Sequence, residues 1–377
     1  MIYGELGDSR TRRTVTGAAR LLRALRLDGM LLAGLAAVSL FGLFVLYSAA
    51  GDDTALWLSQ LTRVGIGFAL MIMLAQVPDH FLRMLSPAIF ALGLLLLGIV
   101  AVAGDVGKGA QRWLDLGLVR FQPSEIMKLA VPMMCAWYLR QRPLPPSLRD
   151  VVVVLLVVAV PVGLVAEQPD LGTALLVAAS GLIVLVMAGL PWIYVLGGVA
   201  LLGAAVPVAW HFLHDYQRQR VLTLLDPESD ALGAGYHIIQ SQIAIGSGGI
   251  FGKGWTNGSQ AQLEFLPERS TDFIFAVIGE ELGLLGLVAL LAGYLFIVGR
   301  GIYMSLQCRD AFARLLSGSI ALTFFVYACV NAGMVMGLLP VVGVPLPLVS
   351  YGGTSFVTLM AGFGILMSLH SSRKLVG

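Results

Sequence analysis

The chain has 377 residues, of which 58% are hydrophobic and only 12% charged, and its mean hydropathy is +0.86. A soluble domain carries roughly 25% charged residues, so this composition indicates a polytopic membrane protein. The net charge of +2 gives no basic surface for nucleic acid, and we expect no nucleic-acid partner. The three cysteines lie in or beside apolar segments without metal-ligand spacing, so neither a disulfide framework nor a zinc site is expected.

A membrane-spanning helix needs about 20 apolar residues. Ten segments meet that condition: 29–49, 56–77, 87–104, 121–139, 150–166, 171–189, 192–213, 271–299, 314–338 and 347–370. We therefore predict an all-α polytopic membrane protein with about ten transmembrane helices. Only Leu190–Pro191 separates the sixth and seventh spans, which predicts a tight helical hairpin there, because proline suits the first turn of a helix.

Lysine and arginine residues predict the orientation. Residues 1–27 read as a cytoplasmic basic tail, in which Arg20–Leu27 form either a short amphipathic helix on the membrane or part of a disordered segment. With this tail inside, the inner segments hold about fifteen Lys/Arg residues and the outer segments about seven. Both termini are therefore predicted to be cytoplasmic, with residues 28–374 forming one transmembrane domain.

Two outer segments stand out. Residues 105–120 are short and amphipathic, with Trp113 suited to the membrane interface, and residues 214–270 form a large extracytoplasmic loop between spans seven and eight. Long loops in compact proteins are usually functional. The glycine-rich run GSGGIFGKGW (246–255) lacks the spacing of a phosphate-binding P-loop. Its glycines instead favour a tight backbone path against another element or a ligand.

Asp272 lies where the polar part of segment 264–286 (EFLPERSTDFIFAVIGEELGLLG) becomes an apolar helix. An acid at the mouth of a membrane helix is costly unless it has water, a partner or a task. Since Ser270, Thr271 and Asp272 are all preferred cap residues, helix capping is the alternative interpretation. The predicted helix 271–299 would be about 43 Å long, against a hydrocarbon core of about 30 Å, so it must tilt, break or project.

Glu125 and Lys128 are spaced i, i+3 near the outer end of the fourth span, so they share a helix face and can pair. They either form a structural ion pair or set the ionisation of a third group, and Asp272 is predicted at the same depth. Asp170 follows proline and precedes Thr173 by three residues, which is typical of a helix cap. Segment 338–356, rich in proline and glycine, reads as a broken or re-entrant segment beside a cavity that opens outward.

Six motifs then carry a resemblance to a known family. They are GAQRWLDLG, FQPSEIMKLAVP, EQPDLGTALL, GYHIIQSQIAIGSGGIFGKGW, FLPERSTDFIFAVIGEELG and GLLPVVGVPLPLVSYGGTSF. Together, and in this order, they resemble the SEDS family (shape, elongation, division and sporulation), and its elongation branch more than its division branch. The resemblance covers residues 28–374.

The resemblance implies a peptidoglycan glycosyltransferase of the bacterial cytoplasmic (inner) membrane that polymerises lipid II into β-1,4 glycan strands on the outer face during cell elongation. It implies inverting transfer, with undecaprenyl diphosphate as the leaving group. The implied partners are a class B penicillin-binding protein of the elongation type, resembling PBP2, and other membrane proteins of the elongation complex. The family pattern implies that the essential acid is Asp272, and its SEIxK motif falls on Glu125 and Lys128.

The leaving diphosphate needs positive charge. Candidates for substrate binding are the RW motif and the outer basic residues: Arg112, Trp113, Arg120, Arg218, Arg220, Lys253 and Arg269. The alternative for the basic residues is that they anchor lipid headgroups or are solvated loop charges. No dedicated metal-ligand cluster is visible, so no cofactor is assigned, and a divalent cation (Mg or Mn) at the diphosphate stays open.

Two other classes of function remain to be weighed. A lipid II or ion transporter would also combine ten spans with charges inside the membrane, but transporters often contain inverted repeats. Here the long outer loop and the broken final segment have no counterparts in the first five spans. A scaffold that only recruits wall enzymes is the third alternative. Purified protein given lipid II in detergent separates all three, since only a polymerase forms glycan.

Overall fold

The computed structural model describes residues 22, 24–51, 53–107, 110–115, 120–212, 215–230, 233–263, 265–266 and 268–372. The predicted basic tail therefore lies outside the described residues except for its last few positions. The same is true of residues 373–377.

Long helices lie at all ten predicted spans in the described part of the chain. They are α2 (Gly29–Ala50), α3 (Thr54–Ala75), α4 (Asp79–Ala103), α5 (Pro123–Leu139), α6 (Leu148–Glu167), α7 (Leu171–Met187), α8 (Trp192–Phe212), α12 (Ile274–Leu306), α13 (Ala311–Val335) and α14 (Gly353–Ser371). By length and composition, seven of these helices could each cross a membrane: α2, α3, α4, α6, α12, α13 and α14. The protein is therefore a multi-pass membrane protein, and the count of ten spans stays a prediction.

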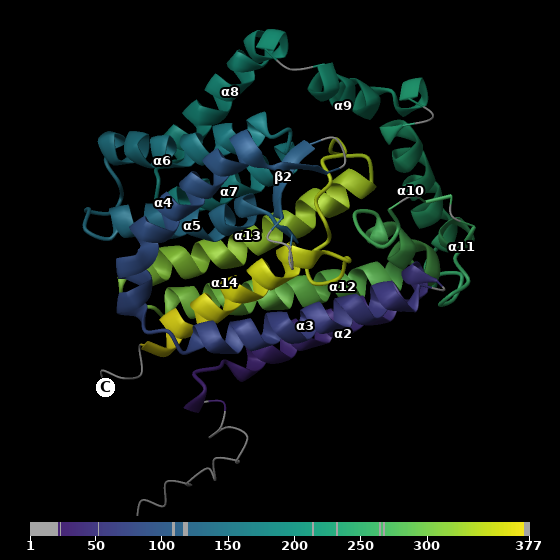
Figure 1. Ribbon diagram of the computed structural model, residues 1–377, viewed down its shortest axis with the longest axis horizontal. Helices are drawn as coiled ribbons and strands as arrows, with labels where there is room; N and C mark the ends of the chain where they lie inside the picture. Colours follow the sequence, from purple (N-terminus) through teal and green to yellow (C-terminus); the bar gives the residue numbers. More distant parts are fainter. Residues whose placement is uncertain are drawn as a thin grey trace, which may run out of the picture.

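Helix α13 lies at the centre of the bundle, packed against α5, α7, α12 and α14. In Figure 1, α2, α3, α12 and α14 run side by side along the long axis, with the outer-loop helices α10 and α11 at one end. Large apolar side chains on α13, such as Phe312, Phe324 and Met334, are fully or almost fully buried. Since lipid is as apolar as these side chains, their packing fixes the arrangement of neighbouring helices more than their hydrophobicity does.

Helix α8 diverges from the bundle, which makes the prediction of a tight α7–α8 hairpin wrong. Figure 1 shows α8 leaning away from α6 and α7. The connection does turn tightly, with Gly189 at φ +84°. However, Trp192, Ile193 and Leu196 are 75%, 70% and 63% exposed, so the face of α8 near the turn packs on no neighbour among the described residues.

A small antiparallel sheet is the exception to the all-α prediction. It consists of β1 (Asp105–Gly107), β2 (Ala110–Asp115) and β3 (Arg120–Phe121), in the order β1-β2-β3. Asp105 pairs with Trp113 and Leu114 with Phe121. The segment between α4 and α5, which was predicted only to be short and amphipathic, is therefore a short, folded strand structure.

The large outer loop carries α9 (Asp215–Leu225), the 3-10 turn η1 (Pro227–Asp230), α10 (Ala234–Gly248) and the short α11 (Ser259–Gln262). Its glycine-rich part packs directly against α12. A Cβ atom on Gly248 would lie 1.9 Å from the Gly279 carbonyl oxygen, and one on Gly252 would lie 2.1 Å from that of Glu281. The prediction that these glycines allow a close backbone path is confirmed.

Helix α12 breaks at Gly283, whose φ of +65° is non-helical. At the break, α12 exchanges backbone hydrogen bonds with the loop: the carbonyls of Glu280 and Glu281 accept from the amides of Lys253 and Gly254, at 2.9 and 3.0 Å. In return, the amides of Leu284 and Leu285 donate to Gly249 and Ile250, at 3.0 and 3.2 Å. A broken membrane helix is tolerated where such partners satisfy its backbone. The break resolves the predicted excess length of this helix.

The carboxylates of Glu280 and Glu281 complete this junction. Glu280 accepts from the Lys253 ammonium at 2.8 Å, the Ser259 hydroxyl at 3.1 Å and the Gln260 amide at 2.9 Å. Glu281 accepts from the Ser48 hydroxyl at 2.5 Å, near the end of α2. Both side chains are buried, so each needs these partners.

Candidate functional site

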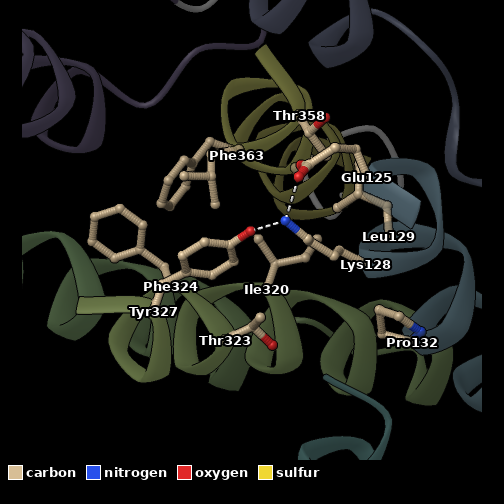
Figure 2. Close-up of a pocket in the computed structure, with 12 residues that line it drawn as sticks. Glu125, Lys128, Leu129, Pro132, Ile320, Thr323, Phe324, Tyr327, Thr358 and Phe363 are labelled. Carbon is tan, nitrogen blue, oxygen red and sulfur yellow. Dashed lines mark hydrogen bonds and ion pairs between the residues drawn. The ribbon is translucent and has the colours of Figure 1, made fainter. Parts of the chain in front are cut away.

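Helix α5 begins at Pro123, which suits a first helical turn, and this places Glu125 and Lys128 on one face within its first two turns. The Lys128 ammonium lies 2.5 Å from Glu125 Oε1 and also donates to the Tyr327 hydroxyl on α13. Figure 2 shows the lysine between these two partners. Glu125 and Lys128 are only 4% and 7% exposed, and Glu125 Oε2 is buried without a hydrogen-bond partner. The predicted Glu125–Lys128 pairing is thus present, and Glu125 Oε2 remains an acceptor without a donor.

This charged group lines a small cavity between α5, α13 and α14. The remaining lining is mostly apolar: Leu129, Pro132, Ile320, Thr323, Phe324, Leu359, Gly362 and Phe363, with Thr358 at one edge. A largely apolar pocket with a few converging polar groups is typical of a ligand site. The Thr323 hydroxyl is likewise buried without a partner.

Asp272 is not the N-cap of α12, and the capping interpretation is wrong. The helix begins at Ile274, with Phe273 at the cap position and no side-chain cap hydrogen bond. Residues 270–273 instead form a turn that precedes the helix. The acid is half-buried there, and its Oδ2 lies 3.4 Å from where a Cβ atom on Gly343 would stand. Gly343, at φ +71°, therefore brings the 338–352 coil next to the carboxylate.

Asn331 fixes the backbone at Asp272. Its Nδ2 donates to the Asp272 carbonyl at 2.8 Å and to the Val344 carbonyl at 2.7 Å, and the side chain is fully buried. Because Tyr327 and Asn331 are four residues apart on α13, the contacts to Lys128 and to Asp272 come from neighbouring turns of one helix, about 6 Å apart along its axis. Asp272 is not among the residues that line the described cavity.

His237 lies on the other side of this turn. Its ring stacks on Phe273, with centroids 5.5 Å apart and planes at 19°. Burial lowers the pKa of His237, and the nearby Glu268 and Asp230 carboxylates offset this only in part. The imidazole beside the Asp272 turn is therefore neutral at pH 7.

Arg112, on β2, belongs to a second polar cluster at the start of α7. Its guanidinium donates to the Gln168 carbonyl at 3.2 Å and to the Pro169 carbonyl, and lies 3.9 Å from Asp170. Asp170 also accepts from Gln122 at 2.8 Å and caps α7 through the Thr173 amide at 3.1 Å. The predicted cap is confirmed. Trp113, beside Arg112, is partly buried.

The other predicted cations lie on several separate elements. Arg218 on α9 donates to the carbonyls of Trp210 and His211, both at 3.0 Å, so it holds the end of α8. Arg269 donates to the Ala261 carbonyl. Lys253 forms the buried junction with Glu280, which gives it a structural task that the sequence did not reveal. Arg220 lies on α9, and the side chain of Arg120 is outside the described residues.

The residues missed by sequence analysis are Tyr327, Asn331 and Gly343. Asn331 offered a usable signal, because a polar amide inside an apolar helix needs partners. Tyr327 offered less, since tyrosine is common in membrane helices. Gly343 is one of several glycines in segment 338–356. Only the structure shows that this glycine, and not another, lies against the Asp272 carboxylate.

The fold and the site describe a polytopic membrane protein with a charged, partly apolar cavity below a folded outer loop. The model of the FtsW/RodA/SpoVE family, described as cell cycle protein, matches residues 27–375. The chain belongs to this family, and it is a membrane-embedded glycosyltransferase.

Relatives and solved structures agree with this assignment. Peptidoglycan glycosyltransferase MrdB of Escherichia coli (strain K12) is 52% identical over 351 residues, covering 93% of this chain and 95% of the relative. MrdB of Helicobacter pylori (strain J99) is 38% identical over 86% of both chains. Thermus thermophilus rod shape determining protein RodA superposes with a TM-score of 0.70 at 31% identity, covering 92% and 97% of the two chains. A chain from a peptidoglycan synthase complex, solved to explain how polymerization and crosslinking are coordinated, gives a TM-score of 0.80 at 37% identity, covering 92% and 98%.

Proposed function

We propose that this protein polymerises lipid II into β-1,4 glycan strands during cell elongation, with Asp272 as general base. It is a peptidoglycan glycosyltransferase, as its 52% identity to MrdB over nearly the whole length supports. The observation that carries the catalytic assignment is the placement of Asp272. Its turn is tied by Asn331 to the same helix whose Tyr327 contacts the Lys128–Glu125 pair at the cavity.

The reaction is one inverting displacement. Lipid II carries its sugar in an α linkage to diphosphate, and the product is β-linked. The Asp272 carboxylate takes the proton of the acceptor sugar hydroxyl while that oxygen forms the new bond to the anomeric carbon. The bond from this carbon to the diphosphate breaks, and its electron pair leaves with the undecaprenyl diphosphate. General base catalysis of this kind contributes on the order of 10²–10⁴-fold.

Lys128 supplies positive charge near this centre. In our proposal it favours the ionised form of Asp272 and Glu125 balances the local charge, consistent with an opposite charge lowering a carboxylate pKa. The unpartnered Glu125 Oε2 leaves one acceptor in the cavity for a sugar hydroxyl. Arg112, whose contacts tie β2 to the start of α7, is one of the cations that would supply positive charge to the bound diphosphate in this proposal.

A divalent cation at the diphosphate is a further part of the proposal. Within the described residues, no group of three or more His, Cys, Asp or Glu side chains is placed to hold a metal ion. Magnesium is commonly held by one or two carboxylates together with substrate phosphates. The donors present fit only that substrate-dependent binding, and Asp272 is the carboxylate nearest to the proposed reaction.

We further propose that the protein works with a class B penicillin-binding protein, which crosslinks the strands, and with other membrane proteins of the elongation complex. The similar chain from a complex that combines polymerization and crosslinking supports such a partner. The predicted orientation, with both termini cytoplasmic and the site facing outward, is part of the same proposal.

The deciding experiment gives purified protein lipid II in detergent and measures glycan by gel. We expect wild-type protein to form polymer and Asp272→Asn to form none while keeping its melting temperature. Polymer from wild type excludes a pure transporter and a pure scaffold. Polymer from Asp272→Asn at the wild-type rate would disprove the base assignment. Thr358→Val, at the cavity edge, is a matched control that leaves all charges in place.

A further inference from the structure

Arg63 is a charged residue within the apolar helix α3. It is the tenth residue from Thr54, so it lies about 14 Å along the helix from that end. Neighbouring Ile66 is 54% exposed, as expected for a helix that faces lipid. A cation at such a position is expensive and normally has a partner or a function.

No anionic partner of Arg63 exists among the residues that the structure describes. The guanidinium stacks on Tyr351, with Cζ 4.3 Å from the ring centroid. Nη1 is buried and has no hydrogen-bond acceptor. Stacking on an aromatic ring offsets part of the desolvation cost, but it leaves Nη1 without an acceptor.

The group opposite Arg63 is also positive. A Cβ atom on Gly353, the first residue of α14, would lie 3.6 Å from Arg63 Cζ. The cap residue Gly352 provides no side-chain cap hydrogen bond to this helix. The first amides of α14 therefore have no cap, and they carry the positive end of the helix dipole. Two positive groups held against each other favour the binding of an anion between or beside them.

The residues around the first turn of α14 are connected to the Asp272 turn. Ser350, Gly352 and Ser355 line a small cavity there, and neither Arg63 nor Tyr351 is among its lining residues. The Tyr351 amide donates to the Ser270 carbonyl at 2.8 Å, and the Ser350 hydroxyl donates to the Thr271 carbonyl at 2.5 Å. The segment that carries Arg63's stacking partner is thus bonded to the two residues directly before Asp272.

We propose that Arg63, Tyr351 and the uncapped N-terminus of α14 form an anion site for the phosphate or diphosphate ester of a lipid. The site would hold the headgroup of a lipid whose chain lies along α3. Its position beside the Asp272 turn favours a polyprenyl diphosphate, an identity that rests on the proposed function. An anionic phospholipid offers the same phosphate chemistry, and the experiment separates the two sources.

The test measures binding to purified full-length protein in dodecyl maltoside, without any reaction. The probes are undecaprenyl diphosphate, phosphatidylglycerol and, as the chain without phosphate, undecaprenol. The variants are Arg63→Gln and Arg63→Lys. The matched control is Arg140→Gln, because Arg140 also stacks on a ring, that of Trp137 at 5.4 Å, at the other end of the bundle.

We expect undecaprenyl diphosphate to bind wild type and Arg140→Gln equally. Arg63→Gln should weaken it about tenfold or more, as expected for loss of a charge-assisted contact, and Arg63→Lys should weaken it less. Undecaprenol should bind all variants alike and weakly. If phosphatidylglycerol binds as tightly and loses as much in Arg63→Gln, the site exists but takes any lipid phosphate.

Two results would overturn the proposal. One is equal diphosphate binding by wild type and Arg63→Gln. The other is equal weakening by Arg140→Gln, which would indicate nonspecific attraction. Arg63→Lys keeps the test valid if Arg63→Gln fails to fold. Failure of this site and failure of the Asp272 assignment can be told apart, because binding is measured without polymerisation. If the anion site is wrong, Arg63→Gln binds the diphosphate like wild type. If the Asp272 assignment is wrong, Asp272→Asn still synthesises glycan.

Discussion

Asn331 lies one helical turn beyond Tyr327 on α13, and the two side chains hold opposite parts of the site. Tyr327 accepts from the Lys128 ammonium, while Asn331 donates to the Asp272 carbonyl at 2.8 Å. Helix α13 is packed against α5, α7, α12 and α14, and the side chains of Tyr327 and Asn331 are buried. The spacing between the lysine and the acid is therefore set by a rigid element rather than by the outer loop.

Replacing Asn331 tests this rigid spacing. We expect Asn331→Leu to lower the rate of lipid II polymerisation on the order of 10- to 100-fold, because a small misplacement of a catalytic group can cost that much. The Asp272 turn and the Val344 carbonyl both lose their donor. Kinetics of the purified variant check this, with Thr323→Val on the same helix as control. An unchanged rate would show that the coil positions Asp272 without α13.

The Lys128–Glu125 pair makes a prediction that separates stability from activity. Removing one member of a buried pair typically costs about 3–5 kcal/mol, because the other charge stays behind. Lys128→Met and Glu125→Gln should each lower the melting temperature, while the double variant should recover most of that loss. Polymerisation should stay lost in the double variant. Recovery of both properties together would reduce the pair to a packing role.

Gly283 should tolerate no side chain. Its φ is +65°, and a Cβ atom would lie 2.4 Å from the Gly252 amide nitrogen. Gly283→Ala should therefore destabilise the protein by about 1–3 kcal/mol. Gly299, on the same helix and with nothing within 4 Å, is the matched control. Gly299→Ala should be neutral or slightly stabilising. Thermal unfolding in detergent compares them, and equal melting temperatures would contradict the role of the break.

Asp28 gives a pH dependence of stability. Burial alone would raise its pKa, but hydrogen bonds from Arg300 (2.9 and 2.6 Å) and the Leu31 amide, with the Arg300 charge, outweigh burial and lower the pKa. A carboxyl group whose folded pKa is depressed stabilises the protein above its unfolded pKa of about 3.9, and this contribution is lost as pH falls through the folded pKa. Asp28→Asn should therefore unfold at a lower temperature than wild type at pH 7, and the difference should shrink below about pH 4. A difference that is constant from pH 7 to pH 3 would contradict this linkage.

The sequence predicted the helices well because membrane spans have a strong composition signal. All ten predicted ranges contain a helix, and the Glu125–Lys128 pairing and the Asp170 cap are confirmed. The predictions failed where distant segments decide. Asp272 looked like a cap because Ser270–Asp272 is a good cap sequence, yet Tyr351 and Ser350 draw the preceding backbone into a turn and the helix begins at Ile274.

Lys253 shows the same limit. From the sequence alone, Lys253 could not be distinguished from a residue that binds substrate, because it is a basic residue in a predicted outer loop. Its partner Glu280 is 27 residues away and was assigned to the interior of a membrane helix. Only the break at Gly283, which sequence indicated as one of three ways to fit a long helix, brings loop and helix together. The divergence of α8 was equally invisible, since its apolar sequence suits a packed helix and an isolated one alike.

The junction between the glycine-rich loop and α12 limits how this protein can be recombined with its relatives. Two carbonyls and two amides of the helix find their partners in residues 249–254, and the Glu280 carboxylate finds three of its own between Lys253 and Gln260. A chimaera that takes the loop from one parent and the helix from another must keep this whole set in register. Crossover points before α10 or after Leu285 preserve one parent's junction intact, whereas a crossover between 255 and 280 divides it.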